Sequence, residues 1–145
     1  MDTSSAFEIS AAGMALERAR VEVAALNLAN VHSTAAAGQP GYNPMRVVAT
    51  SAPAASFDAT MESQAGLAAL KPGYRLEATN APAHLVHEPG HPMADAKGFV
   101  SYPGVDTATE MMSLMSATRA YEANVAAMSM ARALAMKSLE IGGTQ

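Results

Sequence analysis

Residues 103–143 read PGVDTATEMMSLMSATRAYEANVAAMSMARALAMKSLEIGG, and this stretch decides the fold class. Pro103-Gly104 interrupts regular structure before it, and Gly142-Gly143 provides a clear stop after it. Between these breaks, apolar residues recur at alternating spacings of three and four. This pattern predicts one amphipathic helix over residues 105–141, with a stripe suited to docking on another helix. The predicted seam consists of Met111, Leu114, Thr118, Tyr121, Val125, Met128, Arg132, Ala135 and Leu139.

A second amphipathic helix is predicted at the other end of the chain, over residues 4–30. Ser5 and Glu8 have the spacing of a capping box, in which each side chain satisfies a free backbone N–H of the first turn. Gly13 lies beside the apolar stripe, which indicates either a close approach of another backbone or simple tolerance of glycine. The seam of this helix consists of Ile9, Ala12, Leu16, Ala19, Val23 and Leu26.

Polar residues mark the start of the C-terminal helix and the end of the N-terminal helix. Asp106 or Thr107 is the predicted N-cap of the C-terminal helix, and Thr107 with Glu110 repeats the capping-box spacing. Asn27 and Asn30 stand near the end of the N-terminal helix. Their amides predict either a C-terminal cap or a contact between helices, and the sequence leaves both interpretations open.

The middle region, residues 31–104, is predicted to be rich in loops and to contain a small β element. Residues 31–42 have loop composition, and residues 51–72, rich in Ala, Ser and Pro, are predicted to be flexible. The strands at 74–79 and 99–102 are expected to be half-buried, because apolar and polar residues alternate in them. The full set of predicted strands is Met45–Thr50, Tyr74–Thr79, His84–His87 and Phe99–Tyr102. The predicted fold class is therefore mainly α with a small β-containing middle.

The composition excludes several functional classes. Charged residues make up 15% of the 145 residues, the net charge is -4, and no basic patch predicts nucleic-acid binding. Cysteine is absent from the sequence, which excludes disulfides and thiol chemistry and suits either a reducing compartment or a chain that travels unfolded. The first residues lack the pattern of a cleaved signal peptide, and no run approaches the ~18 apolar residues of a membrane span. We therefore expect a soluble protein.

The C-terminal helix is rich in methionine. Methionine side chains are flexible and are frequent on helical surfaces that fit several partners. Because these residues fall on more than one face, we expect the helix to contact neighbours on several sides; ordinary filling of a core is the alternative. The six methionines are Met111, Met112, Met115, Met128, Met130 and Met136.

One motif suggests metal chemistry. His87-Glu88-Pro89-Gly90-His91 matches the H-E-x-x-H pattern of zinc proteases, which requires a helix that puts both histidines on one face. A proline inside a helix costs ~3 kcal/mol, so Pro89 prevents that helix. A zinc site in a loop, made by His84, His87 and His91, is the alternative. The preferred interpretation is a surface turn, with no metal, no cofactor and no catalytic residues.

Several stretches resemble one family. ALNLANV at residues 25–31 is similar to the N-terminal motif of the flagellar axial proteins, which form the rod, the hook and the hook–filament junction. HEPGHPMAD at residues 87–95, with GFV at 98–100 and PGVD at 103–106, resembles the signature of rod members. Residues 110–125 resemble the C-terminal helix of these members.

The resemblance implies a non-enzymatic structural subunit of the proximal rod in the bacterial flagellar basal body, the axial drive shaft used for motility. Such subunits leave the cytoplasm through the flagellar type III export apparatus without a cleaved signal, which implies a periplasmic location. The terminal helices would pair as an antiparallel coiled coil within a helical assembly. The implied partners are copies of the chain, other rod proteins and the adaptor at the rod–membrane-ring junction, with no nucleic acid and no membrane insertion.

The assembly interface is expected at seam positions of both helices, joined by two residues of the resembling motif. From the seams we predict Leu16, Val23, Leu26, Leu114, Tyr121, Val125 and Met128; the resemblance adds Asn27 and Asn30. Two other hypotheses remain. One is a metal-dependent hydrolase that uses His87, Glu88 and His91. The other is a cytoplasmic adaptor that binds amphipathic helices through its methionine-rich face.

Overall fold

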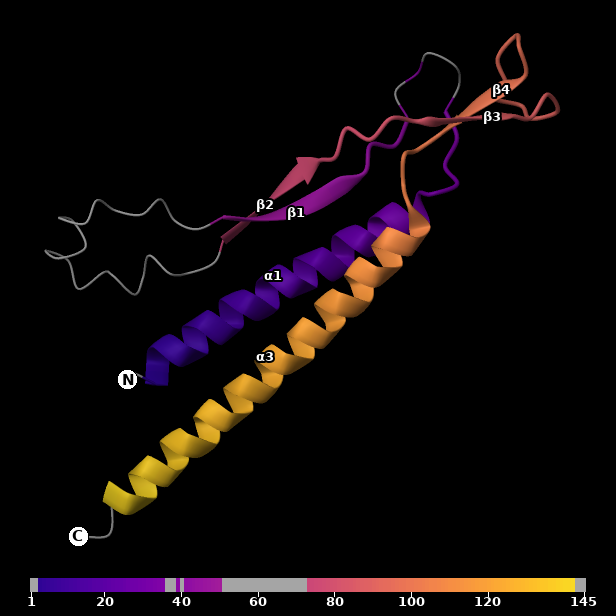
Figure 1. Ribbon diagram of the computed structural model, residues 1–145. Coiled ribbons are helices and arrows are strands. Elements are labelled where there is room, and N and C mark those ends of the chain that lie inside the picture. Colours follow the sequence, from indigo (N-terminus) through magenta and orange to yellow (C-terminus); the bar gives the residue numbers. More distant parts are fainter. Residues whose placement is uncertain (1–2, 36–38, 40, 51–72, 143–145) are drawn as a thin grey trace, which may run out of the picture. The chain divides into compact units, whose positions relative to one another are not determined.

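The computed structural model describes residues 3–35, 39, 41–50 and 73–142 of the chain (Figure 1). The predicted flexibility of residues 51–72 lies outside the described residues. Two long helices dominate: α1 spans Thr3–Ala29 and α3 spans Thr107–Gly142. Between them in sequence, the described residues form four short strands: β1 (Met45–Thr50), β2 (Gly73–Ala78), β3 (His84–His87) and β4 (Phe99–Tyr102). The mainly helical fold with a small β middle is therefore confirmed.

The strands form two separate two-stranded sheets, one of β1 and β2 and one of β3 and β4. In the β3–β4 sheet the strands are antiparallel, with His84 opposite Tyr102 and His87 opposite Phe99. Ala35 forms an isolated β-bridge with Ser101 on β4, and the Ala35 N–H donates to the Ser101 carbonyl oxygen at 3.3 Å. Beside the β1–β2 sheet, Thr79 N–H donates to the Pro44 carbonyl oxygen at 2.8 Å.

The chain divides into two compact units, and each long helix contributes to both. One unit contains α1 up to Ala19 and α3 from Ala117, together with strand residues 49–50 and 73–75. The other contains residues 20–48 and 76–116, which include the end of α1, the β3–β4 sheet and the first turns of α3. The predicted division into residues 4–30, 31–104 and 105–141 stays a prediction.

Burial of the strands differs from the expectation. In β4 the prediction of half burial is correct, because Val100 is fully buried and Ser101 and Tyr102 are partly buried. In β2 it is wrong, since Tyr74 and Leu76 are both exposed. A two-stranded sheet supplies only one hydrogen-bonded neighbour for each strand, and Tyr74 and Leu76 stay 46% and 50% exposed.

The loop between β3 and β4 is built by turn chemistry. The Asp95 side chain accepts hydrogen bonds from the backbone N–H groups of Lys97 and Phe99, both at 2.8 Å. These bonds, the one from Phe99 first, hold the pKa of the Asp95 carboxyl below its usual value, against a smaller opposing effect of burial. Gly98 has φ of 79°, a left-handed conformation that glycine adopts without strain. Asp95 is therefore a turn residue.

The buried faces of the helices differ from the predicted seams. On α1, Ala19 and Val23 are buried as the seam requires, but Ile9 and Leu26 are exposed. On α3, Leu114 and Met128 are half-buried, whereas Met111, Tyr121, Val125 and Leu139 are exposed. The less exposed face of α3 instead contains Glu110, Leu114, Ala117, Asn124, Met128, Ala131 and Ala135. The predicted seam of α3 lies about one residue away from this face along the helix, because the prediction was based on the positions of large apolar residues.

Small residues explain where the buried face lies. A Cβ atom added to Gly13 would come within 3.1 Å of the Asn124 side chain, so Gly13 marks a close approach of α1 to α3. Buried Ala19 and Ala117 belong to the same compact unit as this contact. Helix axes approach more closely where small side chains meet, which leaves the larger apolar side chains on other faces.

The described residues contain no helix that is both long enough and apolar enough to cross a membrane.

Candidate functional site

The side chain of Asn27, near the end of α1, is the buried centre of a part-buried polar cluster. It is 0% exposed, and each polar atom of its amide makes two hydrogen bonds. Nδ2 donates to the Met45 carbonyl oxygen at 2.8 Å and to Glu110 Oε1 at 3.0 Å. Oδ1 accepts from Tyr42 Oη–H at 2.8 Å and from Met45 N–H at 3.1 Å. We call Asn27, Tyr42, Met45 and Glu110 the Asn27 cluster.

The cluster joins three segments that are far apart in sequence. Asn27 belongs to α1, Met45 begins β1 and Glu110 lies in the first turn of α3. Because Met45 offers both its N–H and its carbonyl oxygen, it fixes the orientation of the Asn27 amide. A carboxylate at Nδ2 and a phenol at Oδ1 complete the four bonds that an asparagine side chain can make. The cluster therefore holds the end of α1, the start of β1 and the start of α3 together.

Asn30 has a different role from Asn27. Its Nδ2 donates to the Leu26 carbonyl oxygen at 2.8 Å, and Ser33 Oγ donates to the Asn30 carbonyl oxygen at 2.8 Å. Both bonds satisfy groups at the C-terminus of α1, where carbonyl oxygens lack partners within the helix. Both interpretations left open by the sequence are thus realised, one by each amide: Asn30 caps the helix, and Asn27 makes the contact to another helix.

The start of α3 frees Glu110 for the cluster. Asp106 is the N-cap, because its Oδ1 accepts the Ala108 N–H at 3.2 Å and its other carboxylate oxygen accepts the Thr109 hydroxyl. The predicted capping box of Thr107 with Glu110 is wrong, since Glu110 bonds Asn27 instead. The predicted box of Ser5 with Glu8 is not supported either: α1 begins at Thr3, so Ser5 lies inside its first turn.

The electrostatics of the cluster keep Tyr42 protonated. Burial raises the pKa of the Tyr42 phenol, and the nearby Glu110 carboxylate raises it further. A protonated phenol is the form that donates to Asn27 Oδ1. Among the described residues, no buried side-chain nitrogen or oxygen atom lacks a hydrogen-bond partner. The arrangement is that of a structural connector.

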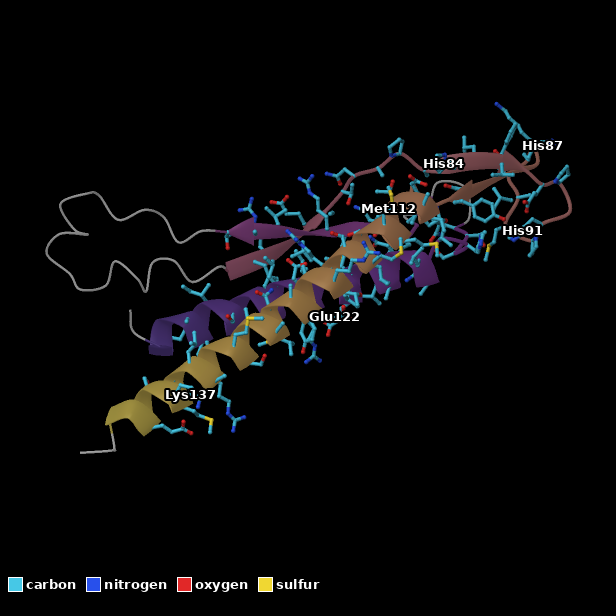
Figure 2. The ribbon with its side chains drawn as sticks, turned by 60° about the horizontal axis from the view of Figure 1, so that its bottom comes forward. His84, His87, His91, Met112, Glu122 and Lys137 are labelled. Atoms are coloured by element: carbon cyan, nitrogen blue, oxygen red, sulfur yellow. The ribbon has the colours of Figure 1, made fainter. Side chains whose placement is uncertain are left out.

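His84, His87 and His91 lie on β3 or in the loop that follows it (Figure 2), and their side chains have different surroundings. His84 and His87 are three residues apart on β3, so their side chains leave opposite faces of the strand. The His87 ring packs edge-on against Phe99, with centroids 5.1 Å apart, and His91 Nδ1 accepts the Met93 N–H at 3.1 Å. Within the described ranges, no group of three or more His, Cys, Asp or Glu residues is placed to hold a metal ion.

Glu88, the base that a hydrolase would need, has a structural partner. Its carboxylate accepts the Tyr102 hydroxyl at 3.2 Å, and its backbone N–H donates to the Gly98 carbonyl oxygen at 2.8 Å. Burial raises the pKa of Tyr102, and the bond to Glu88 raises it further. His91 N–H donates to the Glu88 carbonyl oxygen at 3.1 Å, as in a turn. The geometry of residues 88–91 therefore agrees with the predicted surface turn.

The predicted interface residues are distributed over buried and exposed positions. Val23 and Asn27 are buried, Leu16, Asn30, Leu114 and Met128 are half-buried, and Leu26, Tyr121 and Val125 are exposed. Their contribution to an interface between subunits stays a prediction. Sequence reasoning missed Tyr42, Met45 and Glu110 as partners of Asn27. The available signal was that Glu110 begins a segment, residues 110–125, that resembles the C-terminal helix of rod members.

The Asp106 cap leads to a prediction about pH. Hydrogen bonds from the Thr109 hydroxyl and then the Ala108 N–H hold the pKa of Asp106 below its usual value. A carboxyl whose pKa is lowered on folding stabilises the protein above its unfolded pKa of about 3.9, and this contribution is lost as the pH falls through the folded pKa. We expect the melting temperature to drop below about pH 4 in the wild type. The drop should be smaller in Asp106→Asn, which keeps the cap without the charge.

Thermal melts followed by circular dichroism between pH 7 and pH 2.5 test this prediction. Asp106→Ala is the second variant, and it should melt lower than Asp106→Asn at pH 7, because alanine cannot cap. Equal pH profiles for the wild type and Asp106→Asn would show that the cap does not contribute in this way.

Comparisons with known proteins give a consistent result. Residues 96–141 match the family described as "Flagellar basal body rod FlgEFG protein C-terminal". The chain is 38% identical over 137 residues to the flagellar basal-body rod protein FlgC of Escherichia coli O6:H1, covering 94% of this chain and 95% of that protein. It is 39% identical to the protein of the same name from Salmonella typhimurium, with the same coverage. The protein of that name from Bacillus subtilis is 36% identical over 141 residues, with 92% of this chain and 94% of the relative covered.

Proposed function

Since this chain belongs to the FlgC family of flagellar basal-body rod proteins and is a structural subunit of that rod, we propose that it acts through the exposed faces of its two terminal helices. In this proposal it is a non-enzymatic subunit of the proximal rod, which transmits torque. The Asn27 cluster holds together the ends of the helices, and neighbouring subunits cover the apolar side chains that the isolated chain exposes.

The observation that carries this proposal is the number of large apolar side chains exposed on α3. Patches of this kind on soluble proteins mark interaction sites, because leaving them in water costs free energy. Methionine predominates among these side chains and adapts to irregular neighbouring surfaces. The exposed set on α3 is Met111, Met112, Met115, Tyr121, Val125, Met130, Leu134, Met136 and Leu139.

We further propose that α1 and α3 pair in an antiparallel coiled coil. Two contacts support this, one in each compact unit: Gly13 approaches Asn124, and Asn27 bonds Glu110. The earlier residue of α1 has the later partner in α3, as antiparallel helices require. A polar contact at one position of a helix pair can fix its register, which is the role proposed for Asn27.

The partners and the route to the rod are also proposed. They are copies of this chain, other rod proteins and the adaptor at the rod–membrane-ring junction, after passage through the flagellar type III export apparatus. A sequence without cysteine suits passage in an unfolded state, because no disulfide can form on the way. The final location in this proposal is the periplasmic part of the basal body.

A single cysteine at Ala123 tests the proposal in living cells. Ala123 is exposed on α3, and the wild-type sequence has no cysteine that would give other products. We expect thiol cross-linking of Ala123→Cys to give adducts with other rod subunits or with the membrane-ring junction. A cysteine at exposed Gly90, in the β3–β4 loop, is the matched control. Adducts of Ala123→Cys with cytoplasmic proteins alone, in cells that build flagella without this protein, would contradict the rod assignment and favour an adaptor.

A further inference from the structure

One face of α3 carries a charge pattern that matches itself in reverse. In the compact unit from Ala117 onward, seven exposed residues recur every three or four positions on the side opposite Ala117, Asn124 and Ala135. We call this set the outer stripe: Arg119, Glu122, Ala126, Met130, Ala133, Lys137 and Glu140. Met130 lies at its centre and is 66% exposed.

Each charge of the outer stripe has the opposite charge at the corresponding position on the other side of Met130. Reading forward gives positive, negative, Ala, Met, Ala, positive, negative. A second α3 that runs in the opposite direction and is aligned at Met130 therefore places opposite charges across from each other. Arg119 faces Glu140 of the second copy, Glu122 faces Lys137 of the second copy, and Ala126 faces Ala133. Each of these matches occurs twice, because the pair has a twofold axis.

We propose that the free subunit associates with a second copy through the outer stripe of α3, in an antiparallel pair. Charge complementarity selects this occupant and this direction, since a parallel pair in register would place like charges opposite each other. Arg119 and Glu122 have no ion-pair partner within the described part of the chain, so both are available. The alanines on either side of Met130 allow the two helices to approach closely.

The charges at the end of the stripe must exchange partners. Lys137 Nζ lies 3.0 Å from Glu140 Oε2 in the single chain, with both side chains well exposed (Figure 2 labels Glu122 and Lys137). Exposed ion pairs contribute little, so this exchange costs little. The pair buries one narrow stripe of helix on each side, which is typical of weak association. We therefore expect a salt-sensitive dimer.

This pairing goes beyond the rod function and does not depend on it. A contact with a twofold axis uses the same surface on both copies and closes after two, so it cannot extend into a rod by itself. The dimer is thus a form of the unassembled subunit in which part of the exposed face of α3 is covered.

Charge exchange tests the proposal with the full chain in sedimentation equilibrium at low salt. Glu122→Lys and Lys137→Glu each replace two attractions by two repulsions, and each should raise the dissociation constant by about tenfold or more. The double variant restores opposite charges and should return to within about threefold of the wild type. Arg132→Glu, an exposed charge on α3 outside the stripe, is the control and should leave the constant unchanged.

Paired cysteines test the direction. Under mild oxidation, a mixture of Ala126→Cys and Ala133→Cys should form disulfides at least several times faster than either variant alone, because only an antiparallel pair brings the two positions together. A wild type that sediments as a monomer at every concentration, a double charge variant no better than the single ones, or equal disulfide rates would each overturn the proposal.

Discussion

Replacing Asn27 by aspartate should destabilise the folded chain by about 3 kcal/mol or more at pH 7. The substitution conserves shape but turns Nδ2, which donates at 2.8 Å to Met45 and at 3.0 Å to Glu110, into an acceptor. Two part-buried acceptors, the Met45 carbonyl oxygen and Glu110 Oε1, then lose their donor, and a second carboxylate faces Glu110. Against a total stability of about 5–15 kcal/mol, the change is severe. Urea unfolding followed by circular dichroism measures it.

The same variant should recover stability as the pH is lowered. Burial and the neighbouring Glu110 raise the pKa of the new carboxyl above its unfolded value of about 3.9, so the native state binds more protons than the unfolded state. The stability of Asn27→Asp then falls as the pH rises from the unfolded pKa to the folded pKa of the new carboxyl. The loss of stability relative to the wild type should therefore be smaller at pH 5 than at pH 7. A loss that is equal at both values would show that the new carboxylate is not confined beside Glu110.

Asn30→Asp is the matched control for this experiment. It makes the same chemical change three residues later, where the Asn30 amide donates one bond at the end of α1 to Leu26 O. We expect a loss of about 1 kcal/mol, from that bond and from a negative charge near a helix C-terminus. If both variants unfold at the same urea concentration, the Asn27 cluster does not have the structural role assigned to it.

Gly104→Ala should be the second strongly destabilising change, with an expected loss of about 1–3 kcal/mol. A Cβ atom at this position would lie 2.4 Å from the Pro82 carbonyl oxygen and 2.8 Å from Ala81 Cβ. Neither atom belongs to a long side chain that can rotate away, so the backbone before α3 must shift. Buried Val105 follows directly and would be displaced with it.

Gly90→Ala provides the comparison for Gly104→Ala. An added Cβ atom at Gly90 meets nothing within 4 Å, so its stability should stay within about 0.5 kcal/mol of the wild type. Soft-agar motility of cells that carry either variant gives a functional measurement. We expect reduced spreading for Gly104→Ala and normal spreading for Gly90→Ala. Normal spreading and stability for both would mean that the chain adjusts at Gly104 without cost.

Local sequence patterns predicted the elements well. Strands β1, β3 and β4 have the predicted bounds, because strand alternation and breaker residues are local signals. Helix α3 follows from its cap and its glycine stop. The predicted seam of α3 lies about one residue away from the face that the structure buries. Burial there depends on close approach at small residues such as Ala117, and hydropathy gives such residues little weight.

The Asn27 cluster could not be predicted for a different reason. An asparagine near a helix end has several partners available locally, as Asn30 shows with Leu26. The partners of Asn27 come from β1 and from α3, and no spacing rule connects these segments. Glu110 was predicted to form a capping box with Thr107 at the start of its own helix. Asp106 caps that helix instead, so the Glu110 carboxylate is available to accept a bond from Asn27. Only the three-dimensional structure brings these residues together.

The bond from Asn27 to Glu110 also sets an order of events during folding. The two residues are 83 positions apart, whereas Tyr42 and Met45 lie only 15 and 18 positions from Asn27. Closing a longer loop costs more conformational entropy, so the nearer bonds can form first. A nascent or threading chain that has reached residue 109 can hold three of the four bonds and still lacks the last. The chain therefore cannot complete this cluster until the helix that carries its exposed methionines has begun to emerge.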